Sequence, residues 1–465
     1  MKFCLLVLLS IHSYGRAVAA TANQPEGSVL EKETSGTYLG GARPYPHKQA
    51  WAVEFPDGTI FDLFNLPPGF DSHGLVSGRT SIAVPAGTEI FSDGSADMKG
   101  KAPQILNRRL ERRDLDEKSH AIKEHDRLHR QMAVHEGDRT LLAVRVIASD
   151  ARTTQSKTLL SNSIFGNGVD PVNLVSQMKA CSYGKLNITK AANRSGDANG
   201  KKVSISNGVV TVRIPSISTA QGDGTMRNAI TKELNEIFGV THPTQLADHV
   251  MYCLPENTME GIAYAYINSW GQVYSNEWCT YVSLQMHEMG HSLNFGHSNE
   301  NGTMYEDETG AMGYSYNSND APKTCFNGAK SWQSGWYADK SKTIKSNGGR
   351  KCFNGELHGI ADYPIANTVL LKVKNRSATD YYVNFNAKRG INSGTQEAGD
   401  QVTVTTRNRG FRDSYSESEL VAELGSGESY SFPGYIINVG TINKLAGTAQ
   451  VTVLPTDQSI CEGPT

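Results

Sequence analysis

The chain has 465 residues, of which 38% are hydrophobic and 20% charged, and its formal net charge is −2. A chain of this length predicts two or three domains rather than one. The nearly balanced charge argues against a partner that is a nucleic acid or an anionic membrane surface.

The first 20 residues have the features of a secretory signal peptide. Lys2 is followed by the apolar run Phe3–Leu9, and small residues stand at Ala17–Ala20. An apolar run of about ten residues is too short to span a bilayer. The sequence shows no later segment that could do so. We therefore expect a secreted, extracellular protein with signal peptide 1–20 and no membrane anchor.

Residues 21–139 predict a β-rich propeptide that ends in a charged linker. Short alternating runs at 51–55, 59–64 and 81–85 are broken by Gly, Pro and Asp, as in small β modules. Residues 104–139 are densely charged with mixed sign, which is typical of a solvated helix or a linker. Arg109–Arg113 has a pattern that processing proteases cleave, although an ordinary charged helix is the alternative.

From Thr140 the pattern changes to strands that alternate with helices, and from about Ile365 to strands alone. This succession predicts an α+β fold, with a mixed sheet and an active-site helix in residues 140–362. A β-sandwich-like domain should follow at 363–465. The predicted strands are 141–147, 209–215, 250–254, 261–267, 368–374, 381–386, 402–406, 435–439 and 449–454, and the predicted helices are 171–180, one capped by Thr225, and one starting at Ser275 or Asn276.

Cysteine usage agrees with export. Cys4 belongs to the signal peptide, and an even number of cysteines in the rest of an exported chain indicates disulfides. Six cysteines allow 15 pairings, and the sequence does not choose among them. The six are Cys181, Cys253, Cys279, Cys325, Cys352 and Cys461, and N-glycosylation sequons stand at Asn187, Asn193, Asn301 and Asn375.

The segment from His287 to His297 predicts a metal centre. His287 and His291 are four residues apart, so on a helix they lie about 40° apart on one face and can bind one ion. His297 comes six residues later, so the chain must bend to bring it back. Three imidazoles with an open fourth position are typical of catalytic zinc, and Glu288 can accept a proton from the attacking water.

This segment resembles the metzincin peptidases. They carry Gly at the position of Asn294, and Asn tolerates the same left-handed backbone best after Gly. Metzincins also place a methionine in a tight turn beneath the metal. Met312 fits that role, and Met304 lies too close to His297. Some metzincins have a Tyr two residues further on, which touches the metal or steadies the oxyanion. Tyr314 matches that spacing, although a merely packed tyrosine is the alternative.

Together with Cys325–Tyr337, Thr140–Val146 and Phe165–Leu174, these motifs make residues 140–340 similar to the gametolysin family of secreted metzincins. The resemblance implies a zinc endopeptidase that is made as a pre-proenzyme. Its protein or peptide substrate would be an extracellular matrix or cell-wall glycoprotein. Some family members have Gln in place of the first His, whereas this chain keeps His287.

Several points stay open at this stage. The strand at Gly261–Ile267 could bind substrate as an added strand, or could be plain core. Residues 21–139 lack cysteine, so latency requires a ligand such as Asp71 or His73, or steric cover. The acidic loop Glu306–Glu308 could bind Ca²⁺ or be solvated surface.

The alternative to an enzyme is a catalytically silent zinc-binding glycoprotein with a structural or adhesive role. The presence of Glu288 favours the enzyme, because an inactive descendant often loses its general base.

Overall fold

The computed structural model describes residues 18–19, 26–35, 50–68, 77–78, 80–105, 135–314, 323–345, 350–375, 377–410, 412, 414–458 and 460–461. Asp71, His73, Arg109–Arg113 and most of the predicted signal peptide lie outside this set. Within it, no helix is long and apolar enough to cross a membrane.

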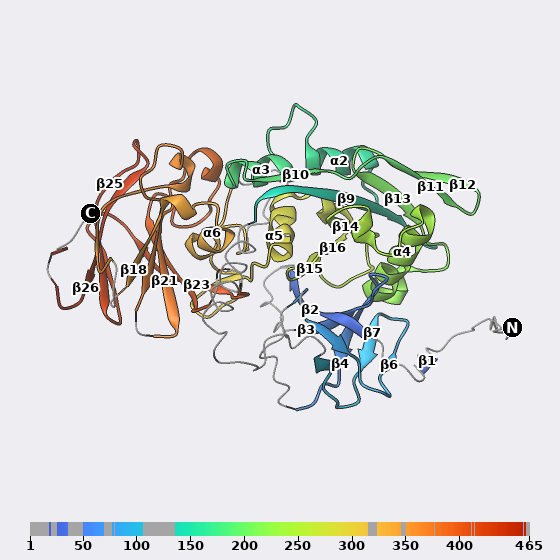
Figure 1. Cartoon of the computed structure of the whole chain (residues 1–465). Helices are drawn as coiled ribbons and strands as arrows, with labels where there is room; N and C mark the ends of the chain where they lie inside the picture. The colour runs from blue at the N-terminus through green and yellow to red at the C-terminus, as the bar shows by residue number, and fades with distance from the viewer. Residues whose placement is uncertain are drawn as a thin grey trace, which may run out of the picture.

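The fold is α+β and mostly β, as predicted, and its largest sheet has 14 strands (Figure 1). The sheet runs in the order β1-β6-β7-β4-β3-β2-β15-β16-β14-β9-β10, with β13 paired to β9, β5 to β2 and β8, and β8 to β5. Its strands are β1 (Val18–Ala19), β2 (Glu26–Ser35), β3 (Ala50–Glu54), β4 (Ile60–Phe64), β5 (Ser81–Ala83), β6 (Glu89–Ile90), β7 (Ser95–Asp97), β8 (Gln104–Ile105), β9 (Gly137–Ile147), β10 (Leu186–Lys190), β13 (Val209–Arg213), β14 (His249–Leu254), β15 (Ala263–Tyr266) and β16 (Gly271–Ser275); β11 (Arg194–Ala198) and β12 (Lys201–Ile205) form a separate hairpin.

The centre of this sheet is parallel. Strand β9 pairs in parallel with β10, β13 and β14, and β14 pairs in parallel with β16. Every residue of β14 is buried, as expected of a parallel strand that is covered on both faces. Strand β15 reverses direction and pairs antiparallel with β16 on one side and with β2 on the other. The N-terminal strands therefore continue the central sheet.

Helices cover both faces of the central sheet. Helices α2, α3 and α5 share one apolar cluster with β9 and β10, whereas α4 packs into a second cluster on the other side. Residues 276–280 form a 3-10 turn and Tyr281 is extended, so α5 begins later than the predicted Ser275 or Asn276. Thr225 does not cap α4, because its hydroxyl donates to the Gln221 carbonyl from inside the helix. The helices are α2 (Lys157–Phe165), α3 (Leu174–Cys181), α4 (Gly222–Phe238), α5 (Val282–Ser292) and α6 (Gly328–Ser334).

The C-terminal part consists of two further sheets that enclose a core of Val383, Val404, Ile437 and Val451. Three strands, β17, β18 and β19, precede residue 363 and yet pair within these sheets; the domain boundary itself stays a prediction. The six-stranded sheet contains β17 (Ser298–Glu300), β18 (Ser341–Lys345), β20 (Leu370–Lys374), β21 (Thr379–Phe385), β22 (Val402–Asn408) and β23 (Ser418–Leu424), and the four-stranded sheet contains β19 (Phe353–His358), β24 (Ser429–Phe432), β25 (Tyr435–Asn443) and β26 (Thr448–Pro455).

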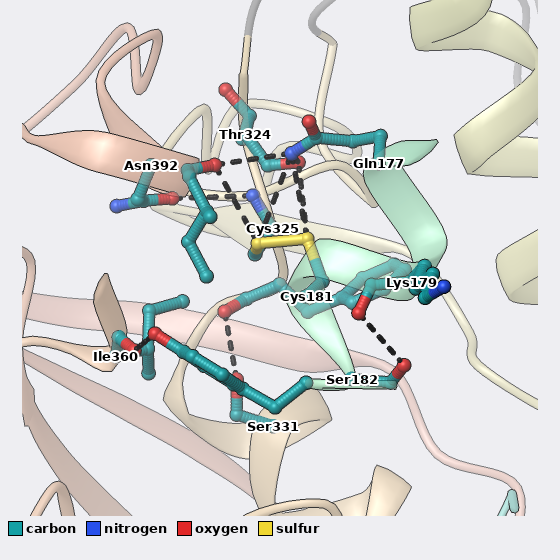
Figure 2. The surroundings of a disulfide bond; sticks show 12 residues. Gln177, Lys179, Cys181, Ser182, Thr324, Cys325, Ser331, Ile360 and Asn392 are labelled. Atoms are coloured by element: carbon teal, nitrogen blue, oxygen red, sulfur yellow. Dashed lines mark hydrogen bonds between the residues drawn. A yellow bond between two sulfur atoms is a disulfide. The ribbon is translucent and has the colours of Figure 1, made fainter. Parts of the chain in front are cut away.

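Three disulfides settle the pairing that the sequence left open: Cys181–Cys325, Cys253–Cys279 and Cys352–Cys461. The first joins α3 to the segment before α6 (Figure 2). Next to it, the Gln177 amide donates to the Thr324 carbonyl at 3.2 Å, and the Cys325 N–H donates to Asn392 Oδ1 at 3.2 Å. The bridge thus ties the chain that leaves the predicted Met-turn to a helix of the central domain.

Candidate metal centre and active site

Helix α5 carries His287, Glu288 and His291, and all three side chains are fully buried. The helix packs through Met286 and Met289 into the apolar cluster that it shares with α2 and α3. A short helix in this position has its orientation fixed by tertiary packing rather than by helix propensity. The packing therefore holds these three side chains in place.

The chain turns out of α5 at Asn294, which has φ +67°. The left-handed backbone predicted for this residue is therefore confirmed. The Phe295 N–H donates to the Gly290 carbonyl at 2.9 Å, and Gln333 Nε2 donates to the Asn294 carbonyl at 2.7 Å. The turn brings His297 back toward the helix.

The structure brings the three predicted ligands together. His287, His291 and His297 each offer one ligand atom, and these atoms lie within 4.8 Å of one another. The ring centroid of His297 lies 4.8 Å from that of His291 and 5.4 Å from that of His287. The Glu288 carboxylate is not part of this cluster.

The hydrogen bonds of the rings suit metal binding. His287 Nδ1 lies 2.9 Å from the Ala311 carbonyl, and His291 Nδ1 lies 2.8 Å from the Phe295 carbonyl. A carbonyl can only accept, so each Nδ1 donates and the lone pair of the ring is on Nε2.

Burial lowers the pKa of His287 to about 4 and the pKa of His291 well below its ordinary value. Both rings are therefore neutral at pH 7, which is the form that binds metal. A buried cluster of three imidazoles, of which His287 and His291 are neutral, fits a zinc ion.

Met312 lies in the predicted turn and is fully buried. Its carbonyl accepts from the Ser298 N–H at 2.9 Å, and the preceding Ala311 carbonyl accepts from His287. A Cβ at Gly313 would collide with the Asp307 carbonyl, and one at Gly310 would collide with the Asn327 N–H. The two glycines thus allow the turn by close approach of backbone to backbone.

Gly290, one turn along α5 from Met286 and directly before His291, faces Met312. A Cβ at Gly290 would collide with Met312 Sδ, a contact far below van der Waals distance. We expect Gly290→Ala to displace Met312 or tilt α5 and to weaken zinc binding by about tenfold, which is a typical loss when a group that supports a metal ligand is disturbed.

Zinc titration of this variant checks the prediction, with Gly271→Ala as the control. An added Cβ at Gly271 meets only Tyr266, at 4.0 Å. Unchanged zinc affinity of Gly290→Ala would show that Met312 does not support the ligands.

A tyrosine that the sequence analysis missed lies against the imidazoles. The Tyr305 ring centroid is 4.0 Å from that of His297 and 5.9 Å from that of His287. Tyr314, which we predicted near the metal, is half-buried, and its N–H donates to the Tyr305 carbonyl at 2.7 Å. Its role stays a prediction. Tyr305 has no distinguishing spacing in the sequence, and it lies in the segment between β17 and α6.

The acidic loop is partly structural. Asp307 is buried, and its carboxylate accepts from the Thr309 N–H at 3.0 Å and from Asn327 Nδ2 at 2.7 Å. A second acidic group lies nearby, in which Glu300, Glu397 and Glu423 have oxygens within 4.8 Å of one another. Burial raises the pKa of Glu397 to about 8. Ca²⁺ binding by Glu306–Glu308 stays a prediction.

The comparison with known protein families places this chain, with its α+β fold and its three buried imidazoles, among the metallopeptidases. Residues 150–434, more than half of the chain, match the model of the gametolysin peptidase M11 family, and the chain belongs to that family. No curated protein and no solved structure matches the chain.

Proposed function

We propose that this protein is a secreted zinc-dependent endopeptidase that hydrolyses peptide bonds of extracellular matrix or cell-wall glycoproteins. It would be made as a precursor, with residues 1–20 as signal peptide and 21–139 as propeptide, and the catalytic domain would have metzincin architecture. The observation that carries the proposal is the buried cluster of His287, His291 and His297 beside Glu288.

The chemistry divides between the ion and the chain. When bound, zinc would act as a Lewis acid that polarises the peptide carbonyl and lowers the pKa of water to about 7. The three imidazoles hold the ion, and their Nδ1 hydrogen bonds fix the rings. Glu288 takes the proton from the attacking water and delivers it to the leaving nitrogen. Tyr314 would donate to the carbonyl oxygen as charge develops there.

Export and glycosylation are part of the same proposal. Asn193 and Asn301 are exposed and can carry glycans, and Asn187 is half-buried. Asn375 is buried, and its Oδ1 accepts from the Ser377 N–H at 2.9 Å, so this sequon is closed in the folded chain. We expect glycans on the first two sites.

The proposal is tested by chelation. The chain is secreted from a eukaryotic host, processed, and assayed on casein and gelatin. We expect a zinc chelator to remove at least nine tenths of the cleavage and one equivalent of zinc to restore it, since the ion takes part in the reaction. Cleavage that survives the chelator would overturn the zinc mechanism. A processed, zinc-loaded protein that cleaves nothing would favour the catalytically silent zinc-binding glycoprotein.

A further inference from the structure

One edge of the six-stranded C-terminal sheet carries a high density of positive charge. Residues 372–380 and 407–413 contain six Lys or Arg and two Asp. The two acids are Asp380 and Asp413, of which Asp413 lies outside the described residues. Strands β20 and β22 flank β21 and both run antiparallel to it, so they end at the same edge of the sheet. The two basic segments, which are distant in the sequence, therefore meet there.

The register of the strands puts these charges on one face of the sheet. Lys374 lies opposite Asp380 of β21, and Asp380 lies opposite Arg407 of β22. Directly opposite residues point to the same face, as do residues two apart along one strand, so Lys372 shares this face. Cations of two strands thus converge on one carboxylate between them.

A tryptophan lies among these cations. Trp332 belongs to α6, which packs on β20, β21 and β22 (Figure 1). Lys372 Nζ is 3.5 Å from the centroid of the Trp332 ring. Arg412 Cζ is 4.9 Å and Arg407 Cζ 5.5 Å from the same centroid. These are cation–π distances, so the ring gathers three positive charges around itself. We refer to Lys372, Lys374, Arg407, Arg409 and Arg412 as the basic cluster.

Asp380 balances only part of this charge. Its buried carboxylate pairs with Lys372 Nζ at 2.8 Å and with Arg409 Nε at 2.8 Å. Burial and the neighbouring charges of Lys374 and Arg407 lower the pKa of Lys372 to about 8, although Asp380 acts in the opposite direction. The cations therefore oppose one another, and an added anion would relieve this repulsion.

Part of the basic cluster can reach a ligand. Arg409 is exposed, and Lys374 and Arg412 are half-buried. Lys372 and Arg407 are buried, and their charges add to the positive potential at the surface. Guanidinium groups form strong charge-assisted hydrogen bonds with carboxylate and other oxyanions. The cluster thus has the chemistry of a site for oxyanions.

The basic cluster is also linked to the turn that carries His297. Arg407 Nη2 donates to the Ser414 carbonyl at 2.6 Å, and Gln333 Nε2 donates to the same carbonyl at 3.4 Å. Gln333 Nε2 donates in addition to the Asn294 carbonyl at 2.7 Å. A polymer held at the cluster would therefore keep the candidate active site close to it.

We propose that the basic cluster binds sulfate or carboxylate groups of an acidic polysaccharide and so retains the protein on the matrix or cell wall that contains its substrate. Such a polymer presents its charges at regular intervals on a stiff chain, so binding costs less ordering than it costs a flexible acidic peptide. The formal net charge of the whole chain is −2, so the attraction is local to the cluster. The binding is independent of hydrolysis, whereas the assignment to the matrix rests on the proposed function.

The first experiment measures binding of heparin, a sulfated polysaccharide, at several salt concentrations. The full chain carries Glu288→Ala, which prevents self-digestion. The added changes Lys374→Gln and Arg412→Gln leave the ion pairs of Asp380 in place. We expect them to weaken binding by about tenfold and to lower the slope of log K on log salt by about two, one for each cation removed.

The matched control is the double variant Lys232→Gln and Lys444→Gln, which removes two charges at exposed positions outside the basic cluster. It should bind heparin as the parent chain does. Equal losses in the two double variants, or no loss in either, would overturn the proposal.

A footprint on the unaltered cluster keeps the test valid even where the variant does not fold. Phenylglyoxal modifies arginine side chains, and mass spectrometry locates the modified residues. We expect heparin at about ten times its Kd to slow modification of Arg409 and Arg412 by about tenfold, because only the free protein reacts. Arg389, whose side chain is 41% exposed and pairs with Asp362, should react at the same rate with and without heparin. Unchanged rates at Arg409 and Arg412 would contradict the proposal.

Other ligands and the proposed function give results of their own. Displacement of heparin by poly-glutamate at an equal concentration of charged groups would mean that the cluster binds an acidic peptide, and the polysaccharide would be the wrong ligand. Displacement by sodium sulfate, but not by sodium chloride of equal ionic strength, would indicate a site for a single small anion and would be equally adverse. Heparin binding by a chain that hydrolyses no peptide would support the cluster and refute the proposed function, and hydrolysis without heparin binding would do the reverse.

Discussion

Glu288→Gln is expected to lower kcat/KM for a peptide substrate by about 10²–10⁴-fold, which is the contribution of a positioned general base. Zinc content should not change, because the buried ligand cluster consists of the three imidazoles alone. Gln keeps the size of the side chain and removes only its ability to take a proton.

Glu236→Gln is the matched control, since Glu236 is an exposed glutamate on α4. It should leave both kcat/KM and zinc content unchanged. Zinc content is measured by elemental analysis, and the fold by hydrogen exchange. If Glu288→Gln keeps its activity at full zinc occupancy, another group must accept the proton, and the assignment of the base is wrong.

The sequence predicted the parts that short-range rules control. Spacing along one helix placed His287 and His291 on a common face. Asn tolerates a left-handed backbone, and Asn294 adopts one with φ +67°, which turns the chain so that His297 comes back toward the helix. Short apolar runs located strands such as β9 and β14, and alternation of apolar residues located β22. These signals depend on neighbouring residues only, so they can be recognised in the sequence without knowledge of the folded structure.

Features that depend on long-range contacts could not be predicted in this way. Strand β2 pairs with β15 across more than two hundred residues of chain, and no pattern in Glu26–Ser35 names its partner. The same holds for Tyr305, which reaches the His297 ring through a loop, and for the choice of Cys325 as the partner of Cys181. Several strand or cysteine pairings have similar local free energies, and only the long-range packing of the folded chain selects one of them.

The C-terminal sheets, which the sequence analysis assigned to a separate domain, also contact the candidate site. The Ser418 N–H of β23 donates to the carbonyl of His297 at 3.0 Å, and β17, which follows His297 directly, pairs in parallel with β23. Lys330 of α6 is fully buried and donates to the Ser416 carbonyl at 2.7 Å. His297, the third predicted ligand, is thus held by the β region as well as by the turn that leaves α5.

This position of His297 leads to the second large expected effect. His297→Gln should weaken zinc binding by roughly a hundredfold or more, because loss of a ligand exceeds the roughly 10–100-fold cost of losing a group that only hydrogen-bonds to a ligand. Hydrolysis should be lost with the metal. Ligand binding stabilises a fold in proportion to RT ln(1 + [L]/Kd), so added zinc should raise the Tm of wild type and not that of the variant.

His358→Gln is the control, because His358 is half-buried in β19 and outside the ligand cluster. It should bind zinc as wild type does and show the same rise of Tm. Competition with a chromogenic chelator measures the affinities directly. Wild-type affinity in His297→Gln would mean that His287 and His291 bind the ion with some other third group. In that case the proposed roles of the turn at Asn294, of the contact with β23 and of the Glu288 carboxylate would be wrong, since all three depend on the position of the His297 ring.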